Sequence, residues 1–297
     1  MSKELDAKLK TALDESRLLI LGAQVLFGFA FQAAFQELFG EIDTAGRTVQ
    51  IAALCLLSFS VAFLIVPSFY HQIACRGRTL HAALGIATSF AGWSLLPLTL
   101  GLGASAYVVF QRFAGMEAGL IFGATLSAIG LALLYGLGFA LRKQRKPLPP
   151  ESETKLKTKI EQLLTEARVI IPGGQALLGF QFVATLTKSF ESLPEEMKWL
   201  HFAGLAAVAL SVLLLMTPAA VHRLAFHGED DPQFFQIGSR LVIAAALPLA
   251  LGISADIAVV VYKITGSGPV SAAIASAAAA VFIIAWYVYP LLARTRN

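Results

Sequence analysis

The chain contains 297 residues, of which 57% are hydrophobic and only 14% are charged, and its formal net charge is +4. Soluble domains carry roughly 25% charged residues, so this composition excludes a soluble enzyme, a disordered segment and a nucleic-acid-binding module. The positive charge does not indicate a nucleic-acid partner, because the basic residues lie in short segments between apolar runs. That distribution is typical of a polytopic membrane protein.

Apolar runs of about 20 residues, the length that crosses a bilayer as a helix, recur along the chain between polar breaks. They predict an all-α integral membrane protein with eight spans, near 18–38, 49–70, 82–110, 118–141, 169–187, 199–221, 241–262 and 269–292.

A charged, proline-containing linker at 142–154 separates residues 1–141 from residues 155–297. We expect one four-helix membrane unit on each side. Shifting the sequence by 151 residues aligns 15–109 with 166–260 without a gap, and 29 of the 95 aligned pairs are identical. Shared apolar composition does not account for the matched polar and structural residues, which include Glu15/Glu166, Arg17/Arg168, Gly22/Gly173, Gln24/Gln175, His71/His222 and Pro97/Pro248. The sequence therefore predicts a tandem repeat.

The even number of spans in each unit predicts that both units enter the membrane in the same orientation. Two such parallel repeats are expected to be related by a pseudo-two-fold axis along the membrane normal. The segments on the side of the two termini hold 18 Lys and Arg residues, and the opposite loops hold 5. This asymmetry predicts that both termini are cytoplasmic.

A short amphipathic helix is expected before the first span of each unit, because leucines recur there at helical spacing between lysines. We expect these helices to lie on the cytoplasmic leaflet, with their lysines against anionic lipid headgroups. The alternative is that each is an extension of the span that follows. The apolar positions are Leu5, Leu9, Ala12 and Leu13 in one unit and Leu156, Ile160, Leu163 and Leu164 in the other, and the lysines are Lys8, Lys10, Lys157 and Lys159.

The pattern Glu-x-Arg-x4-Gly-x-Gln at 15–24, followed by Pro-x3-His at Pro67 and His71, resembles a bacterial family of small four-helix membrane proteins, known as a domain of unknown function. Here the pattern occurs twice. The resemblance implies a bacterial inner-membrane location and a four-helix unit, and it implies no activity.

Polar residues follow one face of the first span, where Arg17, Gln24 and Gln32 recur at helical spacing. Amide groups facing lipid would lack hydrogen-bond partners, so this face is expected to point into the protein. We expect spans one and five to meet near the pseudo-axis, with Gln24 and Gln175 flanking a polar path. The alternative is that each glutamine only supports helix packing, which contributes around 0.6 kcal/mol.

Gly22 and Gly173, the latter preceded by Pro172, are expected to weaken their helices at the inner leaflet. A helix break there would expose backbone N–H groups to an anion, one turn after Arg17 and Arg168. The alternative is a simple bend where the surface helix enters the membrane.

Glu15 and Glu166 need partners on other helices. Two arrangements are open: pairing across the axis with Arg168 and Arg17, or pairing with the histidines that close spans two and six. Those histidines, His71 and His222, are candidates for a proton-linked role or for simple interfacial hydrogen bonding, with haem ligation a more remote option.

Asp256 is the acidic residue predicted to lie within the hydrocarbon region, where an ionisable group is a functional candidate by default. The alternatives are that it reaches the outer interface or pairs with Lys263. Pro97 and Pro248 lie in the middle of spans three and seven, where proline is expected to kink the helix.

These patterns favour a channel or transporter for a small ion or solute, with a path near the pseudo-axis. The alternatives are a non-transporting membrane scaffold or accessory subunit and, more remotely, a haem-binding redox protein. The sequence contains no catalytic, phosphate-binding or metal-binding motif, so we expect no enzymatic activity, no cofactor and no metal. The expected partners are membrane lipids and, through stripes of small residues, a second copy of the chain.

Overall fold

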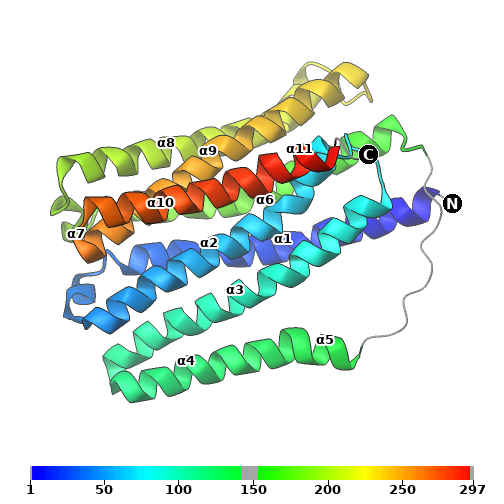
Figure 1. Ribbon diagram of the computed structural model, residues 1–297. Helices are drawn as coiled ribbons and strands as arrows, with labels where there is room; N and C mark the ends of the chain where they lie inside the picture. Colours follow the sequence, from blue (N-terminus) through cyan, green and yellow to red (C-terminus); the bar gives the residue numbers. More distant parts are fainter. Residues whose placement is uncertain (1, 142–152, 295–297) are drawn as a thin grey trace.

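The computed structural model of the protein describes residues 2–141 and 153–294, which form helices joined by turns without any strand (Figure 1). In chain order the elements are α1 (Ser2–Ala33), the 3-10 turn η1 (Glu37–Glu41), α2 (Thr44–Ile73), α3 (His81–Ala114), α4 (Met116–Leu131), the π turn η2 (Ala132–Gly136), α5 (Leu137–Ala140), α6 (Leu156–Ala184), α7 (Lys188–Glu191), α8 (Glu195–Leu224), α9 (Pro232–Thr265), α10 (Gly268–Ile283), the π turn η3 (Ile284–Val288) and α11 (Tyr289–Arg294).

Eight of the described helices are long and apolar enough to cross a membrane, so the chain is an integral membrane protein. They are α1, α2, α3, α4 with η2, α6, α8, α9, and α10 continued through η3 and α11. The predicted number of spans is therefore confirmed.

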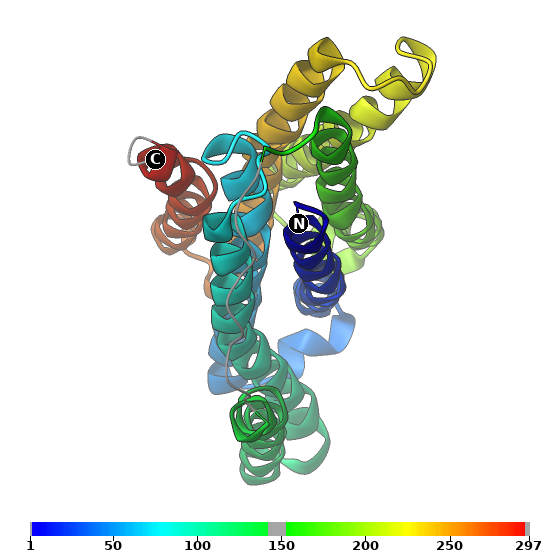
Figure 2. The same ribbon diagram turned by 90° about the vertical axis from the view of Figure 1, so that its right-hand side faces the viewer.

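Two long helices from different halves lie at the centre of the bundle. Viewed along the helices, α2 and α9 occupy the middle, with α1 and α6 on one side and α10–α11 on the other (Figure 2). α1 packs along α6, as expected for spans one and five, and rings that the repeat aligns meet there: Phe29 and Phe180 are 4.8 Å apart between centroids.

Local features of the first half recur in the second half at the spacing of the repeat. The Ser60 hydroxyl donates to the carbonyl of Ser94 at 3.1 Å, and the Ser211 hydroxyl donates to the carbonyl of Ala245 at 2.8 Å. The turn with positive φ after α2 recurs after α8, at Arg76 and Gly77 and at His227 and Gly228.

The amphipathic segments are not separate interfacial helices, so that prediction is wrong. α1 and α6 each run from the amphipathic segment into the membrane span as one helix. The reason is that the apolar stripe packs on protein: Leu5, Leu9 and Leu13 are buried in a cluster with Tyr70 and Leu84.

The predicted breaks at Gly22, Pro172 and Gly173 are also absent, because α1 and α6 continue through these positions as unbroken helices. Pro97 and Pro248 lie inside the helices α3 and α9, which continue through both positions. The proposed anion site on a half-helix N-terminus therefore does not exist in this structure.

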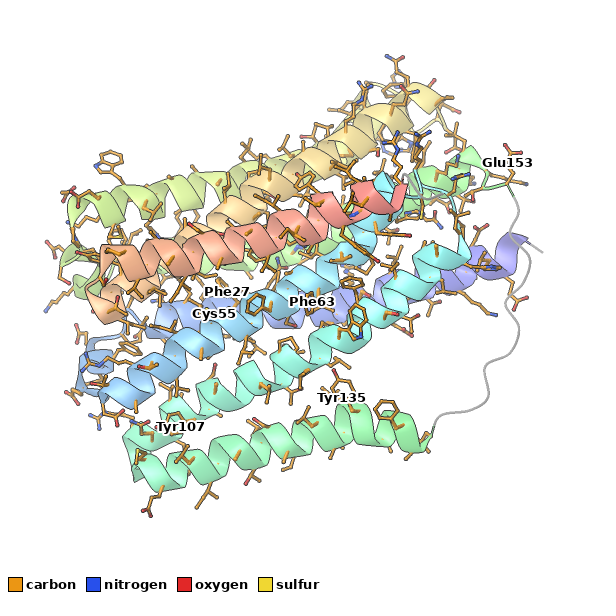
Figure 3. The ribbon with its side chains drawn as sticks, viewed as in Figure 1. Phe27, Cys55, Phe63, Tyr107, Tyr135 and Glu153 are labelled. Atoms are coloured by element: carbon orange, nitrogen blue, oxygen red, sulfur yellow. The ribbon has the colours of Figure 1, made fainter. Side chains whose placement is uncertain are left out.

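The fourth spans of the two halves occupy different positions. Span eight packs on both α9 and α2, and the buried Trp286 donates its indole N–H to the carbonyl of Ala62 at 2.8 Å. Span four packs along α3, where the Tyr135 hydroxyl donates to the carbonyl of Gly92 at 2.6 Å. Figure 3 shows Tyr107 and Tyr135 between α3 and span four.

The side chain of Asp43 caps the N-terminus of α2, at the end of the bundle opposite the termini. Asp43 Oδ1 accepts hydrogen bonds from the backbone N–H of Gly46 at 2.7 Å and from the Gln111 amide at 2.5 Å. These two hydrogen bonds, with that to Gly46 the larger effect, hold the pKa of Asp43 below its usual value. Asp43 thus ties the start of α2 to the end of α3.

Candidate functional site

A buried carboxylate on α6 forms the first polar cluster, which we call the Glu166 cluster. Glu166 Oε1 lies 2.5 Å from His71 Nδ1, and Glu166 Oε2 accepts a hydrogen bond from the Gln72 amide at 2.5 Å. Gln72 Oε1 in turn accepts from the Ser239 hydroxyl at 2.8 Å. Glu166, His71 and Gln72 are 0%, 1% and 3% exposed.

The Glu166 cluster joins three helices at the end of the bundle where both termini lie. His71 and Gln72 are in the last turn of α2, and Glu166 is in the third turn of α6. Ser239 is near the start of α9. The contact of 2.5 Å between His71 Nδ1 and Glu166 Oε1 is a hydrogen bond between two ionisable side chains. The cluster therefore brings an imidazole and a carboxyl group into direct contact inside the protein.

The second polar cluster, the Asp256 cluster, lies toward the opposite end. The Gln181 amide donates to both carboxylate oxygens of Asp256, at 3.0 and 2.9 Å, and His201 Nδ1 is 3.8 Å from Asp256 Oδ1. His201 Nε2 lies 3.2 Å from the backbone carbonyl of Gln181. All three side chains are 0% exposed.

The geometry of His201 fixes which of its nitrogens faces the acid. Because the Gln181 carbonyl can only accept a hydrogen bond, Nε2 carries a proton and donates. Nδ1 then faces Asp256 either as a lone pair or as an N–H. A proton delivered to this cluster has two neighbouring acceptors, the carboxylate and Nδ1.

Asp256 is thus buried, and the alternative pairing with Lys263 is wrong. The ammonium group of Lys263 lies over the ring of Phe35, 5.6 Å from its centroid, where a cation–π contact stabilises it.

Gln24 lies between α1 and α6 and is 2% exposed, yet both atoms of its amide lack a hydrogen-bond partner. A Cβ atom at Gly173 would be 1.4 Å from Gln24 Oε1, so a larger residue at 173 would require the Gln24 side chain to move. Gln32 on the same helix also has a buried oxygen without a partner. Gln24 is therefore a buried polar group whose hydrogen bonds are unfilled, which is costly without water or a ligand.

The expected opposition of Gln24 and Gln175 is wrong, because Gln175 is exposed. Gln175 is two positions beyond Gly173, which places it on the opposite face of α6. The repeat-equivalent contact is missing as well, since no heavy atom lies within 4 Å of a Cβ built on Gly22.

The predicted charge pairs across the axis are not formed either. Glu15 and Arg168 are exposed and Arg17 is half-buried, whereas Glu166 pairs with His71, the other arrangement that the sequence left open. The repeat-equivalent residues Glu15 and Glu166 therefore have different environments.

His222, the repeat equivalent of His71, contacts the ring of Phe234 at 4.5 Å between centroids and has a buried Nε2 without a partner. α2 packs on α1, α3 and α9, whereas α8 packs on α6 and α9, so the two histidines lie at different interfaces. Among the described residues, no three His, Cys, Asp or Glu side chains gather as metal ligands.

Four residues of these clusters were missed by the sequence analysis: Gln72, Gln181, His201 and Ser239. A signal for three of them exists in the repeat. At the shift of 151 residues, Gln72, Gln181 and His201 align with residues of different chemistry, as Asp256 aligns with Ser105; the counterparts are Arg223, Ala30 and Gln50. Polar residues that depart together from a repeat are candidates for one shared site.

Comparison with known protein families matches residues 1–137 and 150–290 to one family, described as a family of unknown function, DUF6328. The chain belongs to this family. The two matched segments are similar to each other, consistent with a tandem duplication of one domain. Searches of curated proteins and of solved structures each found no significant match.

Proposed function

We propose that this member of the DUF6328 family is a transporter that moves a small ion or solute with the help of protons held at its two buried clusters. The observation that carries the proposal is the full burial of two carboxylates, Glu166 and Asp256, each with a glutamine and a histidine beside it. Ionisable groups inside a membrane protein are costly and usually mark proton or ion pathways.

The position of the clusters supports this function. Fifteen residues of α6 separate Glu166 from Gln181, which is about 22 Å along a helix, a large part of the roughly 30 Å thickness of the hydrocarbon core. Gln24 lies between them at the level of Gly173, and neither atom of its amide has a hydrogen-bond partner. The path therefore follows one face of α6, away from Gln175.

A carrier fits these features better than an open channel. Both carboxylates are fully buried, at 0% exposure. The distance along α6 from either cluster to the level of Gln24 is about 10 Å, which is longer than a hydrogen bond. Transfer would require water entry or helix movement, as in alternating access.

The membrane placement belongs to the same proposal. The concentration of Lys and Arg on the side of the termini supports cytoplasmic termini, and the resemblance to a bacterial family supports a bacterial inner membrane. The recurring hydrogen bonds and the pairing of α1 with α6 support two parallel units related by an approximate two-fold axis, from which span four departs.

Proton flux into proteoliposomes tests the proposal, with an internal pH dye and imposed gradients of pH, sodium, potassium or chloride. Asp256→Asn and Glu166→Gln keep the side-chain shape but remove the titrating group, and each is expected to lower flux by about tenfold or more. Glu15→Gln is the matched control, because Glu15 is the exposed repeat equivalent of Glu166.

Equal flux in the wild type and in both cluster variants would overturn the assigned path. Absence of flux in the wild type under every gradient would overturn transport and favour the second candidate, a membrane scaffold. The observation that favours a scaffold is that the carboxylates are fully hydrogen-bonded by neighbouring helices, as static packing also requires.

A further inference from the structure

Five cations converge on two adjoining hollows at the end of the bundle that holds the termini. One hollow has a volume of about 600 Å³ and the other about 380 Å³, and Arg76 and Arg294 line both. We call the combined site the basic pocket, and its cations are Arg76, Arg78, Lys159, Arg240 and Arg294.

Within residues 2–141 and 153–294, the cations of the basic pocket have no acidic partner. No described acidic residue lines either hollow, and none of the five cations forms an ion pair with any residue that the structure describes. Cations held close together repel one another, so an anion in the pocket would stabilise the fold as well as bind.

The wall of the larger hollow is apolar. Ile243, Tyr287 and Leu291 line it beside Arg240 and Arg294, and the Tyr287 hydroxyl is already engaged by the carbonyl of Ile243 at 2.7 Å. The pocket thus combines a basic part with an apolar surface that continues onto membrane-spanning helices.

We propose that the basic pocket binds the headgroup of an anionic phospholipid, with an acyl chain against Ile243 and Leu291. Arginine binds phosphate through two parallel hydrogen bonds, and basic pockets between membrane helices suit anionic headgroups. A soluble phosphate would use the cations but leave the apolar wall without a ligand. The lipid therefore fits the whole pocket, and phosphate fits only part of it.

The pocket also adjoins the Glu166 cluster. Gln72 and Ser239 line the larger hollow, and Gln72 donates to Glu166 while accepting from Ser239. Gln72 therefore connects the wall of the pocket to the buried carboxylate of Glu166. The assignment of the lipid does not depend on transport.

The test measures which lipids the purified protein retains from nanodiscs containing equal amounts of phosphatidylglycerol and phosphatidylcholine, by native mass spectrometry. The wild type is expected to retain phosphatidylglycerol preferentially. The double variant Arg76→Gln, Arg294→Gln is expected to lose about tenfold of that preference, because it changes the two cations shared by both hollows.

Lys155→Gln, Lys157→Gln is the matched control, since it removes two exposed charges at the start of α6 outside the pocket. Equal losses in the two double variants would overturn the pocket in favour of general surface attraction. Leu291→Trp occupies the space beside the apolar wall without changing the charge of the pocket, and it is expected to weaken lipid retention too. This second variant keeps the test valid if the arginine variant folds poorly.

A last measurement compares inorganic phosphate with phosphatidylglycerol as the ligand of the pocket. If phosphate alone raises the melting temperature of the wild type as much as phosphatidylglycerol does, and Leu291→Trp leaves that rise intact, the ligand is a soluble phosphate and the lipid assignment is wrong.

Discussion

Trp286 is predicted to hold span eight against the first half of the protein. Its side chain is 0% exposed, packs against Phe69 and Phe282 at 5.5 and 4.8 Å between centroids, and donates to the carbonyl of Ala62 at 2.8 Å. Replacing a buried aromatic side chain by alanine typically costs 3–5 kcal/mol. We therefore expect Trp286→Ala to destabilise the protein by about 3–5 kcal/mol, and Trp286→Phe by about 1 kcal/mol for the lost hydrogen bond.

Trp93→Ala and Trp199→Ala are the controls, because those side chains are 59% and 70% exposed. Their loss opens no internal cavity, since lipid or water takes the place of the ring. Reversible unfolding of the detergent-solubilised variants by sodium dodecyl sulfate, followed by circular dichroism, measures the differences. A Trp286→Ala variant as stable as Trp93→Ala would refute the packing of span eight against α2.

Four further predictions each concern a single site. The pKa of Asp43 is lowered in the folded protein, so its contribution to stability is present above the ordinary carboxyl pKa and is lost as the pH falls through the folded value; Asp43→Asn should remove this acid-dependent loss of melting temperature. Gly103→Ala should destabilise by about 1–3 kcal/mol, because the new Cβ would lie 1.9 Å from Ser127 Oγ. Gly22→Ala, where no atom lies within 4 Å, should instead stabilise by about 0.5–1 kcal/mol in the same unfolding assay. Gln24→Leu should leave stability equal or higher, since the amide has no partner to lose, while lowering flux in proteoliposomes; unchanged flux would remove Gln24 from the path.

The number of spans and the two similar halves could be predicted from the sequence because they depend on segment length and periodic composition. The pairing of α1 with α6 also followed from the polar face of the first span. These features are averages over many residues, so single substitutions do not obscure them.

The site could be predicted only in part, because it depends on how each helix is rotated. α9 is apolar on nearly every face, so its sequence does not indicate that Asp256 points toward Gln181. The assumption of equal halves also assigned Gln175 the role of Gln24, although it is Gly173 of α6 that lies against the Gln24 side chain. Helix rotation is set by packing against neighbours, which the period of the sequence does not encode.

The absence of the Asp256 cluster from the first half has an evolutionary consequence. In a dimer of identical single units, every mutation appears twice, and a new buried carboxylate would impose its desolvation cost on both copies. Fusion of the two units into one chain lets Gln181, His201 and Asp256 arise together in one half while Ala30, Gln50 and Ser105 remain in the other. The duplicated chain can thus acquire a polar site at half the energetic cost, and its two halves are free to specialise.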